Sequence, residues 1–124
     1  MQRKNGYKVL FYQKENGSCP AEEFLDKLPL KIRAKTAKWI EKLGEFGPNL
    51  PRPYTDVVKG KIRELRVIFS SLHCRFLYFF YGKNIVITHG FIKKTDKVPE
   101  EEINKAHNAM LDFEIRVKKG EISI

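Results

Sequence analysis

The chain has 124 residues, and 24 Lys and Arg residues against 15 Asp and Glu residues give it a net charge of +9. This length predicts one domain, residues 1–124, which can bury enough surface to fold without a metal or disulfide staple. Hydrophobic residues make up 42% of the sequence, which excludes a disordered tail. The positive charge favours an anionic partner, such as nucleic acid, over a cationic substrate.

Several protein classes are excluded by what the sequence lacks. No apolar run approaches the roughly 20 residues that span a bilayer, and no apolar signal segment follows the basic start of the chain. Cys19 and Cys74 form no disulfide framework and suit a reducing compartment. The histidines and cysteines lack metal-ligand spacing, and there is no Gly-rich phosphate loop. We therefore expect a cytoplasmic protein with no membrane association, no cofactor and no metal.

The first half of the chain predicts one strand followed by two helices. An aromatic and β-branched run over Tyr7–Tyr12 is typical of a strand. Pro20 opens a short helix over Ala21–Leu28, and apolar residues at helical spacing predict an amphipathic helix over Leu30–Phe46. Three prolines between positions 48 and 53 then predict an extended loop.

The second half predicts three consecutive strands and a last helix. The strands cover Arg63–Phe69, Arg75–Tyr81 and Ile85–Ile92, and the short turns between them require antiparallel pairing. The last two strands are apolar on both faces, so both faces should be covered. Pro99 opens the last helix and is followed by three glutamates that suit its positive end. We expect an α+β domain with its helices on one side of a small sheet.

Two arginines in neighbouring predicted strands are the most informative polar residues. Arg66 lies inside one strand and Arg75 begins the next, so antiparallel pairing across a short turn would bring them close together. Adjacent guanidinium groups repel each other unless an anion lies between them, and a phosphate matches their hydrogen-bonding geometry. The alternative is that each arginine pairs with a carboxylate of the chain, such as Glu64 or Asp56. The residues alone favour neither interpretation.

Four segments carry a family pattern: Glu-Leu-Arg at 64–66, Arg-Phe-Leu-Tyr at 75–78, His-Gly-Phe-Ile-Lys-Lys-Thr at 89–95, and Pro99 with Glu102-Ile103. Together they resemble the phage-derived, HigB-like branch of the RelE/ParE superfamily of type II toxins. The resemblance implies a RelE-like fold, with a small, mostly antiparallel sheet, two N-terminal helices and a C-terminal helix. It also implies a toxin that cleaves mRNA on the ribosome and is neutralised by a small antitoxin, often a helix-turn-helix protein.

The resemblance implies metal-free RNA cleavage, in which the ribose 2′-hydroxyl attacks the adjacent phosphate. We expect Arg66 and Arg75 to hold the scissile phosphate, and His89 or Lys93 to exchange protons with the RNA. Base-stacking platforms and contacts to flanking phosphates complete the expected substrate-binding set. Its members are Tyr81 and Phe91 for the bases, and Lys59, Lys61 and Lys94 for the phosphates.

Several of these residues have a structural alternative. His89 has the same strand parity as Ile85, Ile87 and Phe91, so a satisfied core histidine explains it as well as a proton shuttle does. Tyr81 and Phe91 suit a core better than a binding surface, because aromatic residues dominate cores. For the whole protein, one alternative is a non-catalytic toxin of the same fold that inhibits a protein target such as gyrase. The other is a plain RNA-binding module.

Overall fold

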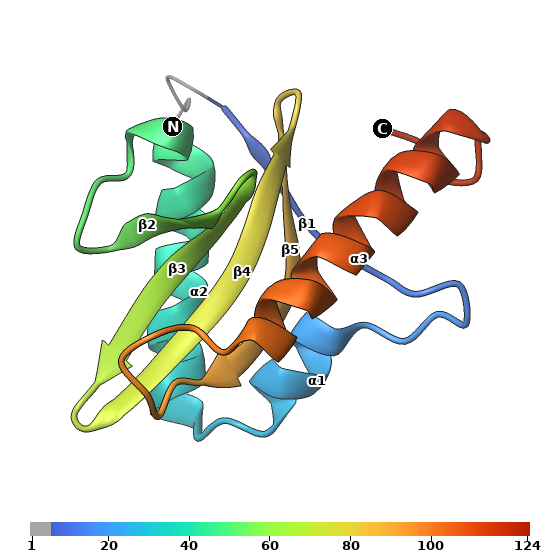
Figure 1. Cartoon of the computed structure of the whole chain (residues 1–124). Coiled ribbons are helices and arrows are strands. Elements are labelled where there is room, and N and C mark those ends of the chain that lie inside the picture. The colour runs from blue at the N-terminus through green and yellow to red at the C-terminus, as the bar shows by residue number, and fades with distance from the viewer. Residues whose placement is uncertain (1–5) are drawn as a thin grey trace.

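The structure is a computed structural model, and it describes residues 6–124. The basic residues at positions 1–5, which entered the expectation of no secretory signal, lie outside the described residues. The strands and helices follow one another along the chain as Figure 1 shows. They are β1 (Lys8–Phe11), α1 (Pro20–Asp26), α2 (Leu30–Phe46), η1 (Gly47–Asn49), β2 (Thr55–Lys59), β3 (Ile62–Phe69), β4 (Leu72–Tyr81), β5 (Asn84–Ile92) and α3 (Glu100–Lys118).

The strands form one sheet in the order β1-β5-β4-β3-β2. The predicted antiparallel pairing of the three consecutive strands is confirmed, since β3 pairs with β4 and β4 with β5 in that sense. The first strand joins the sheet as a parallel neighbour of β5. The sequence reading missed β2, which follows the proline-rich loop and pairs antiparallel with β3, with Asp56 opposite Glu64.

The helices cover both faces of the sheet, so the expectation that they lie on one side is wrong. Ile32 and Leu43 of α2 belong to a core cluster on one face, whereas Met110 and Phe113 of α3 belong to a second cluster on the other face. Figure 1 shows α2 behind the sheet and α3 crossing in front of it. The physical reason was visible in the strands: β4 and β5 are apolar on both faces, and one layer of helices cannot cover both.

A bulge in β5 decides which way its C-terminal end faces. Leu77 lies opposite His89 but Tyr78 lies opposite Ile87, so Thr88 is an extra residue between the two pairs. One inserted residue sends every later side chain to the opposite face of a strand. His89 therefore faces α3 rather than sharing a face with the preceding isoleucines, and the expectation based on strand parity is wrong for that comparison.

Gly90 follows the bulge at a point where the sheet has no room for a side chain. A Cβ atom there would lie 2.5 Å from a ring carbon of Phe24 and 2.8 Å from one of Phe76. We expect Gly90→Ala to lower the free energy of unfolding by about 1–3 kcal/mol, because overpacking forces such rings to shift. Urea denaturation measures this cost. The double variant Gly90→Ala, Phe24→Leu should recover part of it, and equal costs in the single and double variants would contradict the proposed clash.

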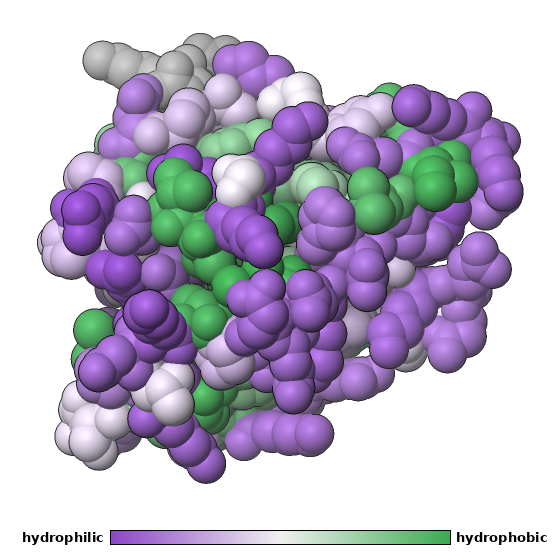
Figure 2. All heavy atoms as spheres, in the orientation of Figure 1, coloured by the Kyte–Doolittle hydropathy of each residue, from purple (hydrophilic) through white to green (hydrophobic). Residues whose placement is uncertain are grey.

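The surface seen in Figure 2 is mainly hydrophilic, and hydrophobic side chains gather in a band across its middle. Exposed apolar residues include Val57 in β2 and Leu111 and Ile115 in α3. Among residues 6–124, none of the helices combines the length and the apolar character that crossing a membrane requires.

Candidate functional site

The strand register brings the two predicted arginines together. Arg66 of β3 and Arg75 of β4 are direct partners across the antiparallel pair, as the short turn between the strands suggested. The next position in the same row is Phe91 of β5, opposite Arg75. The three residues therefore form a row across neighbouring strands, which lie about 5 Å apart.

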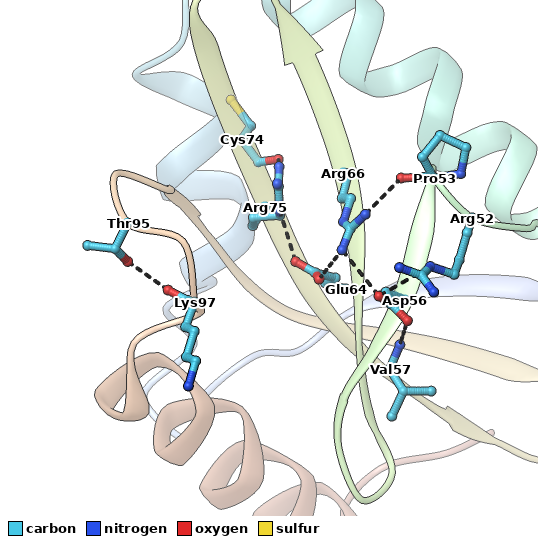
Figure 3. A network of polar contacts seen from close by, with 10 residues as sticks. All are labelled: Arg52, Pro53, Asp56, Val57, Glu64, Arg66, Cys74, Arg75, Thr95 and Lys97. Carbon is cyan, nitrogen blue, oxygen red and sulfur yellow. Dashed lines mark hydrogen bonds and ion pairs between the residues drawn. The ribbon is translucent and has the colours of Figure 1, made fainter.

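A carboxylate of the chain lies between the two guanidinium groups (Figure 3). Glu64 Oε1 is 2.9 Å from Arg75 Nε, and Glu64 Oε2 is 3.2 Å from the Nη2 atom of Arg66. Arg66 Nη2 is also 3.2 Å from Asp56 Oδ2. Of the two interpretations left open by the sequence, the pairing with carboxylates is therefore the one present in this structure. We call Glu64, Arg66 and Arg75 the arginine cluster.

The charges of this cluster are largely removed from water, so each depends on its charged neighbours. Glu64 is 4% exposed and Arg75 is 5% exposed, whereas the Arg66 side chain keeps 22% of its surface. Burial lowers the pKa of Arg75, and Arg66 lowers it further, while the Glu64 carboxylate acts in the opposite direction. Arginine stays charged in proteins, so the cluster holds two cations around one buried anion. The 2.9 Å contact between Arg75 Nε and Glu64 Oε1 is an ion pair but does not have the geometry of a hydrogen bond. Within the described chain, the buried Nε–H groups of Arg66 and Arg75 therefore have no hydrogen-bond acceptor.

Lys93 connects the two arginines to the surface. It lines a cleft of about 640 Å³ with Arg75 and the exposed Lys94, and a second cleft of about 320 Å³ with Arg66 and Glu64. Its backbone N–H donates to the carbonyl of His73 at 2.8 Å, which fixes the start of the loop that leads from β5 to α3. Four of the predicted cations, Arg66, Arg75, Lys93 and Lys94, are thus neighbours at one end of the sheet.

His89 lies outside this group of cations. Its Nε2 lies 2.9 Å from Glu102 Oε1 and its Nδ1 lies 2.9 Å from the Thr88 hydroxyl. In the neutral tautomer that we assign, Nε2–H donates to Glu102 and Nδ1 accepts from Thr88, whose one proton is then turned away from the Leu77 carbonyl at 3.2 Å. Burial lowers the pKa of His89, although Glu102 acts in the opposite direction. Both ring nitrogens are therefore occupied, and this geometry favours the satisfied histidine over the proton shuttle.

The neutral state of His89 has a consequence for stability in mild acid. Its folded pKa lies below its unfolded value of about 6.5, so the unfolded chain binds the extra proton and stability falls as pH falls through that value. The polar and charged groups around the ring are Thr88, Glu102 and Lys105, and Phe91 stacks on its face. We expect the urea midpoint to drop between pH 7.5 and 5.5 in the wild type and to drop less in His89→Gln. Equal drops in both proteins would contradict this assignment.

The predicted substrate-binding residues are dispersed. Lys59 forms an exposed ion pair with Glu100 at 3.4 Å, and with Lys61 it lines a groove between the β2–β3 turn and α3. Tyr81 packs against Phe113 with ring centroids 5.5 Å apart, at the end of β4 opposite to Arg75, which favours its interpretation as core. Phe91 is half-buried and lines a cavity together with His89.

Sequence reasoning missed the central position of Glu64, which it named only as an alternative partner, and the cavity beside His89. The opposition of residues 66 and 75 contained part of the signal, because two buried guanidinium groups need a nearby anion. Among residues 6–124, no three His, Cys, Asp or Glu side chains gather as a metal site would require.

The fold and the site together define a small α+β domain with a basic cluster at one end of a mixed sheet. The chain belongs to the family of phage-derived Gp49-like proteins (DUF891), whose model matches residues 23–111, from α1 into α3. This is a toxin-like family of the RelE/HigB type, and its members are commonly toxins of toxin–antitoxin systems. No curated protein matches the chain in sequence.

Proposed function

We propose that this protein is the toxin of a type II toxin–antitoxin system and a ribosome-associated mRNA endoribonuclease. Family membership supports the toxin class, and the net charge of +9 supports an anionic target. The observation that carries the proposal is the grouping of Arg66, Arg75, Lys93 and Lys94 around two adjoining clefts. The proposed partners are a cognate antitoxin of the helix-turn-helix type, the ribosome and mRNA, and the proposed compartment is the cytoplasm.

The proposed reaction needs no metal. The ribose 2′-oxygen forms a bond to the adjacent phosphorus, the bond from phosphorus to the 5′-oxygen breaks, and the products are a 2′,3′-cyclic phosphate and a 5′-hydroxyl. One proton leaves the 2′-hydroxyl and one reaches the 5′-oxygen. Arg66 and Arg75 would stabilise the charge on the phosphoryl oxygens from the two clefts that they line, and Lys93, which lines both clefts, is the best-placed group for proton transfer. His89 keeps that role only if it leaves Glu102.

The wider RNA contacts of the proposal follow from charge and position. Lys94 lies beside the arginine cluster, and Lys59 and Lys61 lie farther along the sheet. All three would contact phosphates of the RNA strand that flank the cleaved one. A ribosome would add the alignment of the 2′-oxygen with the phosphorus, which this sparse set of acid–base groups does not supply by itself.

Glu64 is the specific observation that favours a different function. Because Glu64 pairs with both arginines and Asp56 pairs with Arg66, the cluster has a purely structural explanation that needs no phosphate. In that case the protein would be a non-catalytic toxin that inhibits a protein target such as gyrase, or an RNA-binding module.

A primer-extension map of a translated mRNA, with and without ribosomes, distinguishes these functions. We expect discrete cleavage sites that require the protein. Because chelation dismantles ribosomes, the EDTA test uses a ribosome-free model RNA, and any cleavage of that RNA should persist in an excess of EDTA. Loss of cleavage on chelation with that RNA would contradict the metal-free mechanism. Growth arrest without any cleavage would favour a protein target.

A further inference from the structure

A cavity of about 670 Å³ lies between α1 and α3, above the end of β5 and beside the bulge. This volume is in the usual range for a pocket that holds a small ligand. Its residues come from segments far apart in the sequence: Phe24 of α1, Thr88 to Phe91 of β5, and one side of α3 from Glu102 to Asp112. None of the arginine cluster lines it, whereas two other members of the predicted site, His89 and Phe91, do.

Three acidic residues line this cavity, and two of them, Glu102 and Asp112, are held in place by neighbouring side chains, whereas Glu23 of α1 is exposed at its edge. Glu102 uses Oε1 for His89 and, at 3.7 Å, for Lys105, while Asp112 uses Oδ2 for the Tyr12 hydroxyl at 2.6 Å and for Arg116 at 2.9 Å. Within residues 6–124, Glu102 Oε2 and Asp112 Oδ1 have no hydrogen-bond or ion-pair partner. The cavity is therefore rich in acceptors held in place by their neighbours.

Hydrogen bonds from neighbouring side chains fix the positions of the Asp112 and Glu102 carboxylates. The hydrogen bond to Asp112 and burial raise the pKa of Tyr12 to about 12, with burial the larger cause, so the phenol remains a donor at neutral pH. On the other side, the ring of His89 is fixed at both nitrogens. Groups held in this way lose little freedom when a ligand binds.

An aromatic wall and a basic rim complete the cavity. Phe91 stacks on His89 with ring centroids 5.8 Å apart, and Phe24 packs edge-on against Phe76, close over Gly90. Lys14, Lys27 and Lys105 are exposed around the opening. A flat apolar wall with polar groups at its edge is the usual way to hold a splayed-out base of single-stranded RNA, while lysines contact its phosphates.

The cavity and the arginine cluster are neighbours across two adjacent strands of the sheet. Phe91 lines the cavity and is the direct strand partner of Arg75. Adjacent strands are about 5 Å apart, which is less than the length of one nucleotide. An RNA strand whose phosphate contacts Arg75 can therefore place a neighbouring base against Phe91.

We propose that this cavity binds an unstacked guanine base of the RNA, next to the phosphate held by Arg66 and Arg75. Guanine is the base that presents two adjacent N–H donors, N1–H and the N2 amino group. Glu102 can accept one of them on its free Oε2 and the other on the second lone pair of Oε1, whose first accepts from His89. Adenine and cytosine offer one donor beside an acceptor on the same edge, and uracil offers one donor between two acceptors. Glu102 is the reading residue, and Asn108 has an amide that can donate to guanine O6. This inference rests on the proposed function for the identity of the strand.

Titration of the isolated protein with GMP, AMP, CMP and UMP, followed by ¹H–¹⁵N NMR, tests the cavity without requiring cleavage. We expect GMP to shift the amides of Gly90, Phe91 and Asn108 and to bind at least fivefold more tightly than the other three. Glu102→Gln keeps an oxygen for His89 but replaces one acceptor by a donor, and it should abolish this preference. Glu101→Gln is the matched control, since Glu101 carries the same charge one residue away and lines no part of the cavity.

The outcomes separate this inference from the proposed function. GMP preference that is lost in Glu102→Gln supports the cavity even if the protein cleaves no mRNA. Cleavage of mRNA with no GMP binding, and with a cleavage map unchanged in Glu102→Gln, would overturn the inference and leave the endoribonuclease intact. Equal binding of all four nucleotides would overturn the guanine assignment. Saturation by N-acetyl-arginine methylamide but not by GMP would overturn it in favour of a protein ligand.

Discussion

Replacement of Glu64 by alanine is expected to lower the free energy of unfolding by about 3–5 kcal/mol, because it leaves a buried guanidinium without its anion. Arg75 is 5% exposed, and Glu64 Oε1, at 2.9 Å from its Nε, is the carboxylate that neutralises it. The same change leaves Arg66 facing Arg75 directly across the strand pair, so repulsion adds to the loss. Urea denaturation monitored by circular dichroism measures the effect.

A compensated variant distinguishes the loss of an ion pair from the loss of packing. In Glu64→Leu, Arg75→Met both charges are replaced by apolar groups of similar volume, which for buried pairs is often neutral or stabilising. We expect this double variant to recover most of the stability that Glu64→Ala loses. Glu101→Ala serves as the control, since it removes an exposed carboxylate from the first turn of α3. A double variant as unstable as Glu64→Ala would show that the volume at these positions matters more than their charge.

The parts of the fold that sequence patterns predicted are those with strong local periodicity. The helix over Leu30–Phe46 and the antiparallel order of β3, β4 and β5 follow from apolar spacing and short turns, which depend on neighbouring residues alone. Strand β2 was not predicted because its five residues follow the proline-rich loop and include the charged Asp56. The prediction that all helices lie on one side of the sheet was wrong, because hydrophobic periodicity indicates that a face is buried but not which helix covers it.

The candidate site was predictable only as far as the strand register was. The turn between β3 and β4 is short, so the opposition of Arg66 and Arg75 followed from counting residues. The position of Glu64 between them depends on side-chain torsions, which no pattern encodes. Thr88 carries no distinctive signal of a bulge, and its extra residue turned His89 toward α3 and created the neighbouring cavity.

The position of Glu64 also determines which arginine gives an interpretable test of toxicity. Arg75→Ala would leave Glu64 buried beside one remaining cation, so a loss of growth arrest would not distinguish a lost contact from an unfolded protein. Arg66 is the better choice, because its side chain keeps 22% of its surface. After its removal, Glu64 retains Arg75, and Asp56 retains Arg52 at 3.5 Å.

We therefore expect Arg66→Ala to relieve growth arrest on induced expression and to slow mRNA cleavage by about 10²–10³-fold, the usual cost of removing one group that stabilises transition-state charge. Its cost in stability should stay near 1 kcal/mol, because partly exposed ion pairs contribute little. Cell growth, a primer-extension time course and a urea midpoint measure the three quantities on one variant. Lys118→Gln removes an equal charge from the exposed C-terminal end of α3 and should remain toxic. If Arg66→Ala folds like the wild type and stays fully toxic, its guanidinium has no part in the reaction, and the arginine cluster is a structural ion pair that supports another surface of the toxin.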